Sequence, residues 1–134
     1  MKIRYKKGYK YQLSSTYTGQ VDIFPHSDIV TEYINLTRDG KIGIKAGYAW
    51  DGPSGPTFDT RDFMRGSLVH DSLYQLIRQG YLSKIMWKVQ ADIELVKICK
   101  EDGMSRLRAW YVYRAVRLSD YLISWLPRKE IEAP

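Results

Sequence analysis

The sequence has one cysteine, two histidines and no long apolar run, and each shortage excludes a class of protein. Because Cys99 stands alone, no disulfide can form within the chain and no cysteine cluster can bind a metal. No segment approaches the ~20 apolar residues that a membrane-spanning helix needs. The basic start of the chain is followed by tyrosine, serine and threonine, not by the roughly 7 to 15 apolar residues of a secretory signal. We therefore expect neither a transmembrane segment nor a signal peptide.

The chain is basic and otherwise of ordinary globular composition. Its 134 residues are 44% hydrophobic and 27% charged, so we expect residues 1–134 to form a single soluble domain. The net charge of +6 is concentrated in two groups: Lys2, Arg4, Lys6, Lys7 and Lys10, and Arg106, Arg108, Arg114 and Arg117. Such groups attract phosphates, but at this excess most basic side chains lie on solvated faces. Nucleic-acid binding is therefore not favoured.

The composition changes near residue 50, from a part rich in tyrosine, threonine and glycine to a part with helical patterns. This order predicts an α+β fold, in which N-terminal antiparallel strands and hairpins precede three helices. The predicted divisions are a β-rich part over 1–48, a glycine- and proline-rich loop over 49–59 and a helical part over 60–127. The predicted strands are Tyr9–Thr18, Gly19–Phe24, Tyr33–Leu36 and Lys41–Lys45.

The turn of one hairpin predicts its register. A three-residue loop that ends at a left-handed Gly40 pairs Leu36 with Ile42 and Ile34 with Ile44. A two-residue loop would place these apolar side chains opposite a lysine and a glycine. Because a shift of one residue moves a strand's apolar side chains to the other face, we prefer the three-residue loop.

Capping residues divide the second part into three helices. The first helix is predicted to be capped by Asp59 or Thr60 and to end at Gly80. The second is predicted to be capped by Ser83 and to end before Gly103. The third is predicted to be capped by Ser105 and to stop by Pro127. Residues that share one face are Phe63, Ser67, His70, Tyr74 and Ile77 on the first helix, and Met86, Val89, Ile93 and Val96 on the second. The connection over residues 79–82 is short, so the first two helices are expected to form an antiparallel pair.

His70 and Asp92 are placed to meet across this helix pair. Each lies about ten residues from the connection, or roughly 15 Å along its helix at ~1.5 Å per residue. A carboxylate opposite an imidazole fixes its tautomer and stabilises the charged ring. His70 is therefore a candidate general base, and Asp92 is the candidate residue that orients it.

Asp71 points about 100° away from His70 around the helix, most naturally toward the preceding loop. That loop contains Gly52 and Gly55, whose turns leave backbone carbonyl oxygens free. A carboxylate facing free carbonyls suits a hard cation such as calcium, which would polarise a substrate carbonyl. Zinc is less suited, because the other histidine, His26, is distant in the sequence.

This loop and helix resemble the secreted phospholipase A2 motif, in which a glycine-rich calcium loop precedes a His-Asp-x-Cys-Tyr helix. The chain keeps Tyr74 but has Leu73 where the motif has a cysteine. The resemblance implies that calcium is held by Asp71 and carbonyls near Trp50, Gly52 and Ser54, that His70 activates water, and that Asp92 supports His70.

A second resemblance covers most of the chain from Gly47 onward. The segments that carry it are residues 47–57 (Gly-Tyr-Ala-Trp-Asp-Gly-Pro-Ser-Gly-Pro-Thr), 65–74 (Arg-Gly-Ser-Leu-Val-His-Asp-Ser-Leu-Tyr), 91–92 (Ala-Asp) and 113–117 (Tyr-Arg-Ala-Val-Arg). They look like the phage and prophage family called domain of unknown function 1353, which has no settled activity. The resemblance implies a phage or prophage origin, and hence a location in the cytoplasm of the infected bacterium or in the virion.

Each candidate residue also has a structural interpretation. Because His70 lies on an apolar face, it is equally explained as a core histidine whose hydrogen bond is satisfied by Asp92. Asp71 equally fits a structural carboxylate that closes the preceding loop by accepting hydrogen bonds from backbone N–H groups. Asp51 is more typical of a turn than of a ligand. The aromatic and arginine series of the third helix fits a membrane interface or a core with stacked arginines. Its members are Trp110, Tyr111, Tyr113, Arg114, Arg117, Tyr121 and Trp125.

The first expectation is a small metal-assisted hydrolase that acts on an ester or amide of the cell envelope, with lipid as one candidate substrate. Its expected site contains His70 and Asp92, a calcium ion, and the nearby Asp51 and Tyr74. The alternative is a non-catalytic virion, tail-assembly or host-interaction protein with a phage or host protein as partner, in which the loop is only a structural clamp.

Overall fold

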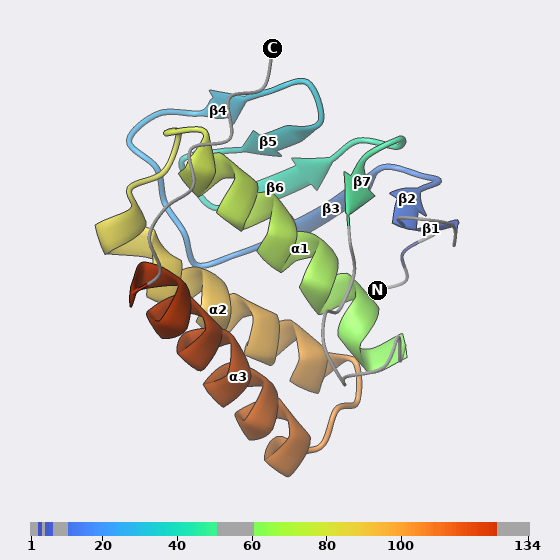
Figure 1. The fold of residues 1–134 in the computed structure, drawn as a ribbon. Helices are drawn as coiled ribbons and strands as arrows, with labels where there is room; N and C mark the ends of the chain where they lie inside the picture. The colour runs from blue at the N-terminus through green and yellow to red at the C-terminus, as the bar shows by residue number, and fades with distance from the viewer. Residues whose placement is uncertain (1–2, 4, 7–10, 51–60, 126–134) are drawn as a thin grey trace.

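The computed structural model describes residues 3, 5–6, 11–50 and 61–125, in which short antiparallel strands precede three helices (Figure 1). The strands are β1 (Tyr5–Lys6), β2 (Tyr11–Leu13), β3 (Tyr17–Gln20), β4 (Ile29–Val30), β5 (Ile34–Leu36), β6 (Lys41–Ile44) and β7 (Ala49–Trp50). The helices are α1 (Arg61–Arg78), α2 (Lys84–Glu101) and α3 (Arg106–Trp125). The predicted α+β fold is confirmed, whereas the assignment of residues 1–134 to one domain stays a prediction.

The strands form two antiparallel sheets, with the orders β1-β2-β7 and β3-β6-β5-β4. In the second sheet Leu36 pairs with Ile42 and Ile34 with Ile44, as the three-residue loop predicts. Gly40 has a φ of 85°, which a side chain would strain. All four paired residues are buried, so the register keeps the apolar face of the hairpin in the core.

Three strand predictions need correction. The segment Tyr9–Thr18 does not form one strand, because β2 and β3 are separated by the exposed residues 14–16. The proposed boundary at Gly19 lies inside β3. Ala49–Trp50, assigned to the loop, forms β7 and pairs with β2. This pairing joins segments far apart in the sequence, which local patterns do not reveal.

The predicted helix boundaries are largely confirmed. The Ser83 side chain accepts a hydrogen bond from the Met86 backbone N–H at the start of α2, and Ser105 accepts from Arg108 at the start of α3. Gly80 and Gly103, which follow α1 and α2, both have positive φ. The predicted caps of α1, Asp59 and Thr60, and the predicted limit of α3, Pro127, lie outside the described residues, so they stay predictions.

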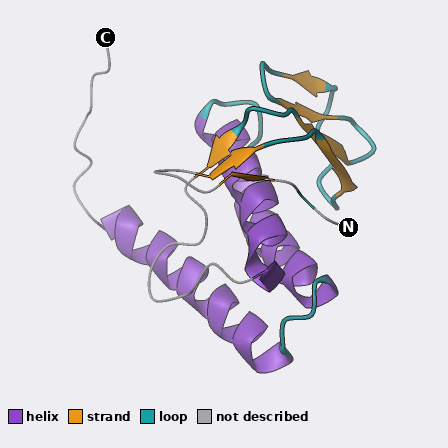
Figure 2. Ribbon diagram, turned by 90° about the vertical axis from the view of Figure 1, so that its right-hand side faces the viewer, coloured by secondary structure: helices purple, strands orange, loops and turns teal. Residues whose placement is uncertain are grey.

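Helix α1 lies between the sheets and the other helices (Figures 1 and 2). Its buried Leu68 and Leu73 belong to a large core shared with the strands. Phe63 joins a smaller core with Leu95 of α2 and Val112 of α3. The axis of α3 diverges from the α1 and α2 pair (Figure 2). The first two helices therefore pack closely together, and they carry His70, Asp71, Tyr74 and Asp92.

The predicted apolar stripe of α2 is not its buried face. Met86, Val89 and Ile93 are exposed, by 59%, 43% and 41% respectively. The buried side chains of α2 are instead Ala91, Asp92, Glu94, Leu95, Ile98 and Cys99. Because this inward face includes two carboxylates, hydrophobic pattern alone does not identify it.

Two features hold α1 and α2 close together. A Cβ on Gly66 would lie 2.8 Å from the Cys99 sulfur and 3.1 Å from the Leu95 carbonyl oxygen, so the helices approach there more closely than a side chain permits. The buried Arg65 guanidinium bonds the Asp102 carboxylate at 3.0 Å and the Glu101 carboxylate at 2.8 Å. These contacts fix the start of α1 against the end of α2.

Candidate functional site

His70 and Asp92 meet between α1 and α2, as their positions in the antiparallel pair predict. The His70 Nε2 lies 2.7 Å from Asp92 Oδ1. Asp92 has no exposed surface, and the His70 side chain is 10% exposed. Since a carboxylate only accepts hydrogen bonds, the Nε2 atom carries the proton of this bond. The predicted orientation of His70 by Asp92 is therefore present.

Two further side chains donate to the same carboxylate. The Tyr74 hydroxyl lies 2.5 Å from Asp92 Oδ1, and the Arg117 Nη1 lies 2.6 Å from Oδ2. Tyr74 follows His70 by four residues and so lies on the same face of α1. Arg117 comes from α3, and in the sequence it belongs to a basic series, to the aromatic and arginine series and to the 113–117 segment of the family resemblance, but not to the predicted site. No local pattern in the sequence signals its contact with Asp92.

Asp71 lies nearer to His70 than its direction on the helix suggests. Its Oδ1 is 3.8 Å from His70 Nδ1, an ion-pair distance that is too long for a hydrogen bond. The Asp71 side chain is 33% exposed, so its carboxylate remains in contact with solvent. The two nitrogens of the imidazole therefore face different carboxylates, one buried and one partly open.

The electrostatics of the site favour the charged histidine. Burial by itself lowers the pKa of His70, but Asp71 and Asp92 outweigh it, and the pKa lies above its ordinary value. Burial likewise raises the pKa of Asp92, but hydrogen bonds from His70, Tyr74 and Arg117 outweigh it and the pKa is lowered. Asp92 is thus an anion at neutral pH. His70 becomes a neutral base only above its raised pKa.

An aromatic ring lies beside the imidazole, and a lysine lies beside that ring. The Tyr74 ring lies 4.1 Å from the His70 ring, measured between centroids. The Lys88 ammonium lies 5.5 Å from the Tyr74 ring centroid, on the side of α2. The site therefore combines one nearly buried imidazole with a lysine beside the neighbouring aromatic ring, whereas the charge of Arg117 is paired with the Asp92 carboxylate.

The end of β7 is held against the same helix. Trp50 is buried, and its indole N–H donates to the Ser67 hydroxyl at 3.1 Å, one turn before Asp71. The other predicted loop residues, Asp51, Gly52 and Ser54, lie outside the described residues. The structure thus brings together His70, Asp71, Tyr74 and Asp92, and anchors Trp50 nearby on α1.

Cys99 is not a candidate nucleophile. It is fully buried where α2 approaches Gly66 of α1. Burial raises the pKa of its thiol to about 12, so it stays protonated at neutral pH. The structure therefore gives Cys99 a packing role between α1 and α2.

Comparisons with known proteins show no relative. No protein-family model, no curated protein and no solved structure matches this chain. Within the part of the chain that the structure describes, no helix combines the length and apolarity needed to cross a bilayer. The phage family and phospholipase resemblances stay predictions, and the functional argument depends on the geometry of the site.

Proposed function

We propose that this protein is a small hydrolase that cleaves an ester or amide of the cell envelope, with His70 as its general base. The observation that carries the proposal is the 2.7 Å contact between His70 Nε2 and the fully buried Asp92 carboxylate. Tyr74 and Arg117 hold this carboxylate from two other directions. An imidazole oriented in this way is suited to proton transfer.

The proposed mechanism uses the nitrogen that does not contact Asp92. When His70 is neutral and Nε2 donates to Asp92, the lone pair on Nδ1 is available to take a proton from water. The hydroxide so formed attacks the substrate carbonyl. Asp92 stabilises the imidazolium, which then gives the proton to the leaving group. Tyr74 and Arg117 act as positioning residues, because they bond Asp92 and keep it ionised.

Asp71 is the proposed protein carboxylate for a calcium ion. Its partly exposed oxygen atoms suit a hard cation, and β7 brings the Trp50 backbone toward the same helix. Over the described ranges, no group of three or more His, Cys, Asp or Glu side chains is placed to bind a metal. The further ligands that we propose are the backbone carbonyl oxygens of the loop near Trp50, with Gly52 and Ser54 as sources. When bound, calcium would polarise the substrate carbonyl.

A phage or prophage origin is part of the proposal and is supported by the segments 47–57 and 65–74, which resemble the phage and prophage family. It places the protein in the cytoplasm of the infected bacterium or in the virion. The positive charge of Lys88 beside the Tyr74 ring supports an anionic envelope component, such as a phospholipid, as substrate.

The test is turnover by His70→Asn. Wild-type protein is assayed with calcium against phospholipid micelles, short-chain nitrophenyl esters and cell-wall fragments. We expect hydrolysis of at least one substrate, and a loss of roughly 10²- to 10⁴-fold in kcat for His70→Asn, which is the usual contribution of a general base. Circular dichroism confirms that the variant is folded.

The matched control is His26→Asn, which changes the other histidine of the chain, an exposed residue in the segment between β3 and β4. This variant should keep the wild-type rate. Wild-type turnover that survives in folded His70→Asn would refute the role of His70. If the wild-type protein hydrolyses none of the three substrate classes, the hydrolase proposal is rejected.

One observation favours the alternative function, a non-catalytic virion, tail-assembly or host-interaction protein. Asp92 is fully enclosed and bonded by three side chains, which also describes a structural anchor between α1, α2 and α3. Under this alternative, replacement of His70 changes the unfolding temperature and leaves binding to a phage or host protein intact. The same variant therefore separates the two functions.

A further inference from the structure

Helices α2 and α3 expose an unusual amount of apolar surface. Ile85 is 96% exposed and Leu107 is 78% exposed. Over residues 84–118, where burial is described, the large exposed apolar side chains of these helices are Ile85, Met86, Val89, Ile93, Leu107, Trp110, Tyr111 and Leu118. Scattered single exposures are ordinary, but a group on two adjacent helices marks an interaction surface.

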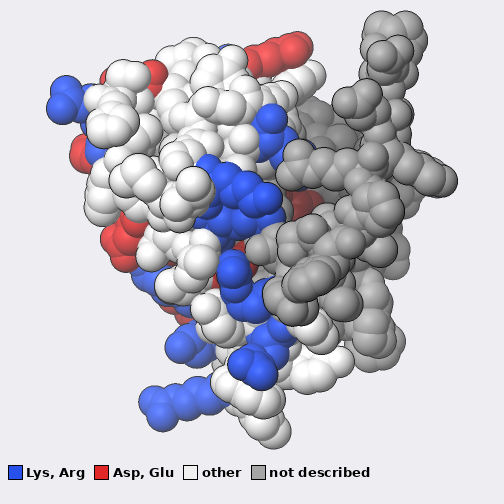
Figure 3. Space-filling model, turned by 60° about the vertical axis from the view of Figure 1, so that its left-hand side comes forward, with Lys and Arg blue, Asp and Glu red and all other residues white. Residues whose placement is uncertain are grey.

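Basic side chains lie among these apolar ones. Over residues 84–118 the chain has Lys84, Lys88, Lys97, Lys100, Arg106, Arg108, Arg114 and Arg117. Three of them pair with carboxylates: Lys97 with Asp22 and Glu94, Arg108 with Asp62, and Arg117 with Asp92. Glu101 and Asp102 pair with Arg65, so the positive charge of this surface is carried mainly by the exposed Lys84, Lys100, Arg106 and Arg114. Figure 3 shows Lys and Arg side chains gathered along the side of the molecule where α2 and α3 lie.

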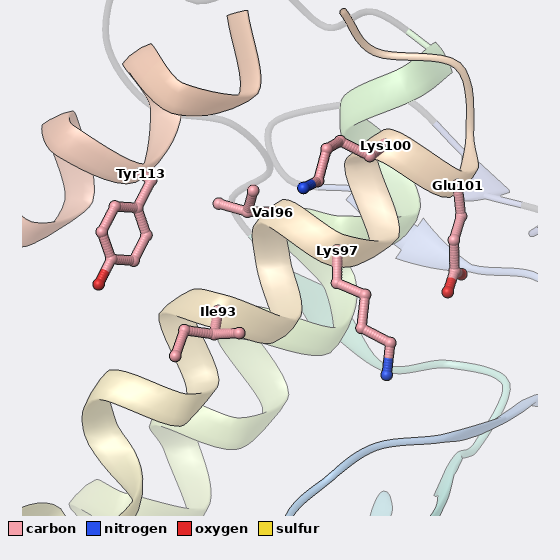
Figure 4. A pocket seen from close by; sticks show the side chains of 6 residues that line it. All are labelled: Ile93, Val96, Lys97, Lys100, Glu101 and Tyr113. Atoms are coloured by element: carbon pink, nitrogen blue, oxygen red, sulfur yellow. The ribbon is translucent and has the colours of Figure 1, made fainter. Parts of the chain in front are cut away.

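A groove lies between the two helices. It has a volume of about 520 Å³ and is lined by Ile93, Val96, Lys97, Lys100 and Glu101 of α2 and Tyr113 of α3. In Figure 4 Ile93 and Val96 extend from α2 on the side where the Tyr113 ring of α3 lies. The Arg114 guanidinium lies 5.8 Å from the Trp110 ring centroid, which places a cation and an amphipathic ring together on α3.

We infer that this α2 and α3 surface docks on an anionic lipid membrane. Aliphatic side chains such as Ile85 and Leu107 would enter the boundary between head groups and acyl chains, and Trp110 would lie at head-group level. The neighbouring lysines and arginines would contact lipid phosphates, each contributing to the attraction of a negatively charged leaflet. The surface lies on helices and needs no chemistry at His70, so the inference is independent of the proposed hydrolysis.

Charge distinguishes the membrane from other occupants. A second copy of the chain would bring the same positive surface against this one, and facing like charges weaken an interface. A nucleic acid would pair with the basic side chains but would leave Ile85 and Leu107 in water. An anionic bilayer accepts both kinds of side chain.

The test measures co-sedimentation of the full chain with vesicles made of ether-linked lipids, which contain no carboxylic ester for the proposed hydrolase to cleave. One set of vesicles is phosphatidylcholine alone, and the other contains one quarter phosphatidylglycerol. We expect binding to the anionic vesicles, weaker binding at high salt, and a blue shift of tryptophan fluorescence that Trp110→Phe reduces. Lys100→Gln and Arg114→Gln should each weaken binding about fivefold.

The apolar contribution is tested by Ile85→Ser and Leu107→Ser, which should each weaken binding roughly tenfold or more. Matched controls are Val30→Ser and Lys45→Gln, because both side chains are exposed but lie in the β part of the chain. These controls should bind like the wild-type protein.

Four results would overturn the inference. The first is equal binding to neutral and anionic vesicles, or none to either, and the second is wild-type binding by Ile85→Ser and Leu107→Ser. The third is a dimer that Ile85→Ser dissociates, in a protein that does not bind vesicles. The fourth is salt-sensitive binding to duplex DNA without vesicle binding. Because the lipids resist hydrolysis, loss of binding here is separate from loss of turnover in His70→Asn.

Discussion

At the scale of single residues, Asp92 organises the candidate site because it is the acceptor for His70, Tyr74 and Arg117. Two of these donors come from α1, and the spacing of four residues between them is visible in the sequence. The third comes from α3 and depends on how that helix crosses α2. Asp71 differs from Asp92 in its exposure, so it is the residue available to a cation.

Asp71→Asn tests the proposed calcium site through stability. Millimolar calcium should raise the unfolding temperature of the wild-type protein, because an ion that binds only the folded state stabilises it. The variant should lose this calcium-dependent rise, since it lacks the proposed carboxylate ligand. Differential scanning fluorimetry with and without calcium measures the shift.

Asp39→Asn is the control for this measurement, because Asp39 is an exposed carboxylate in the hairpin turn. It should respond to calcium as the wild-type protein does. An equal calcium response in Asp71→Asn, or no response in the wild-type protein, would count against the calcium site and leave the contact of His70 with Asp92 unaffected.

At the scale of elements, the close approach of α1 and α2 places His70 within reach of Asp92. Gly66 lies one turn before His70, and Leu95 lies about one turn after Asp92, so their contact continues the same helix interface. The sequence indicated the antiparallel pair from its short connection. The inward face of α2 could not be predicted in the same way, because it includes the buried carboxylates Asp92 and Glu94.

Gly66→Val should destabilise the protein by about 2 to 3 kcal/mol, because the added atoms would overlap Cys99 and Leu95 and force the helices apart. The same movement should lengthen the contact between His70 and Asp92. Urea unfolding measures the free energy of unfolding.

Gly43→Val is the matched control, since a Cβ at Gly43 meets no atom within 4 Å and valine suits strand β6. Its free energy of unfolding should stay within about 1 kcal/mol of the wild-type value. If Gly66→Val is as stable as Gly43→Val, the helices are not held at the distance that the glycine permits.

At the scale of the whole molecule, the strands and α1 share one large core, and α3 is joined to α1 and α2 by a smaller one. This unequal burial leaves much of α3 and one face of α2 exposed. Bonds between distant segments complete the assembly. Arg65 contacts Tyr17 and Asp102, and the Glu94 side chain accepts a hydrogen bond from the Asp22 backbone at 2.6 Å.

The pH dependence of stability should show the contact of His70 with Asp92. Because the pKa of His70 is raised by folding, its stabilisation is complete below the unfolded value of about 6.5 and is lost as pH rises through the folded pKa. The pKa of Asp92 is lowered, so its stabilisation is complete above about 3.9 and is lost as pH falls through the folded pKa. The contribution of the pair should therefore be largest between roughly pH 4 and 6.5.

Urea unfolding from pH 3 to 9 checks this expectation with His70→Asn and His26→Asn. The free energy of unfolding of His70→Asn should fall less on the alkaline side than that of the wild-type protein, because the variant lacks the His70 contribution. His26→Asn should follow the wild-type curve. An unchanged alkaline decline in His70→Asn would show that another group causes it.

The sequence by itself determined the features that follow from local chemistry. Turn geometry at Gly40 set the hairpin register, Ser83 and Ser105 marked helix starts, and a short connection put His70 opposite Asp92. Each depends on residues close in the chain, whose spacing limits the conformations of the backbone.

Only the tertiary structure decided the contact of Arg117 with Asp92, the pairing of β7 with β2, and the burial of Asp92 in place of Ile93 on α2. These outcomes depend on contacts between distant segments. The free energies of these contacts compete across the whole chain, so the residue pattern within one strand or helix does not predict which contacts form.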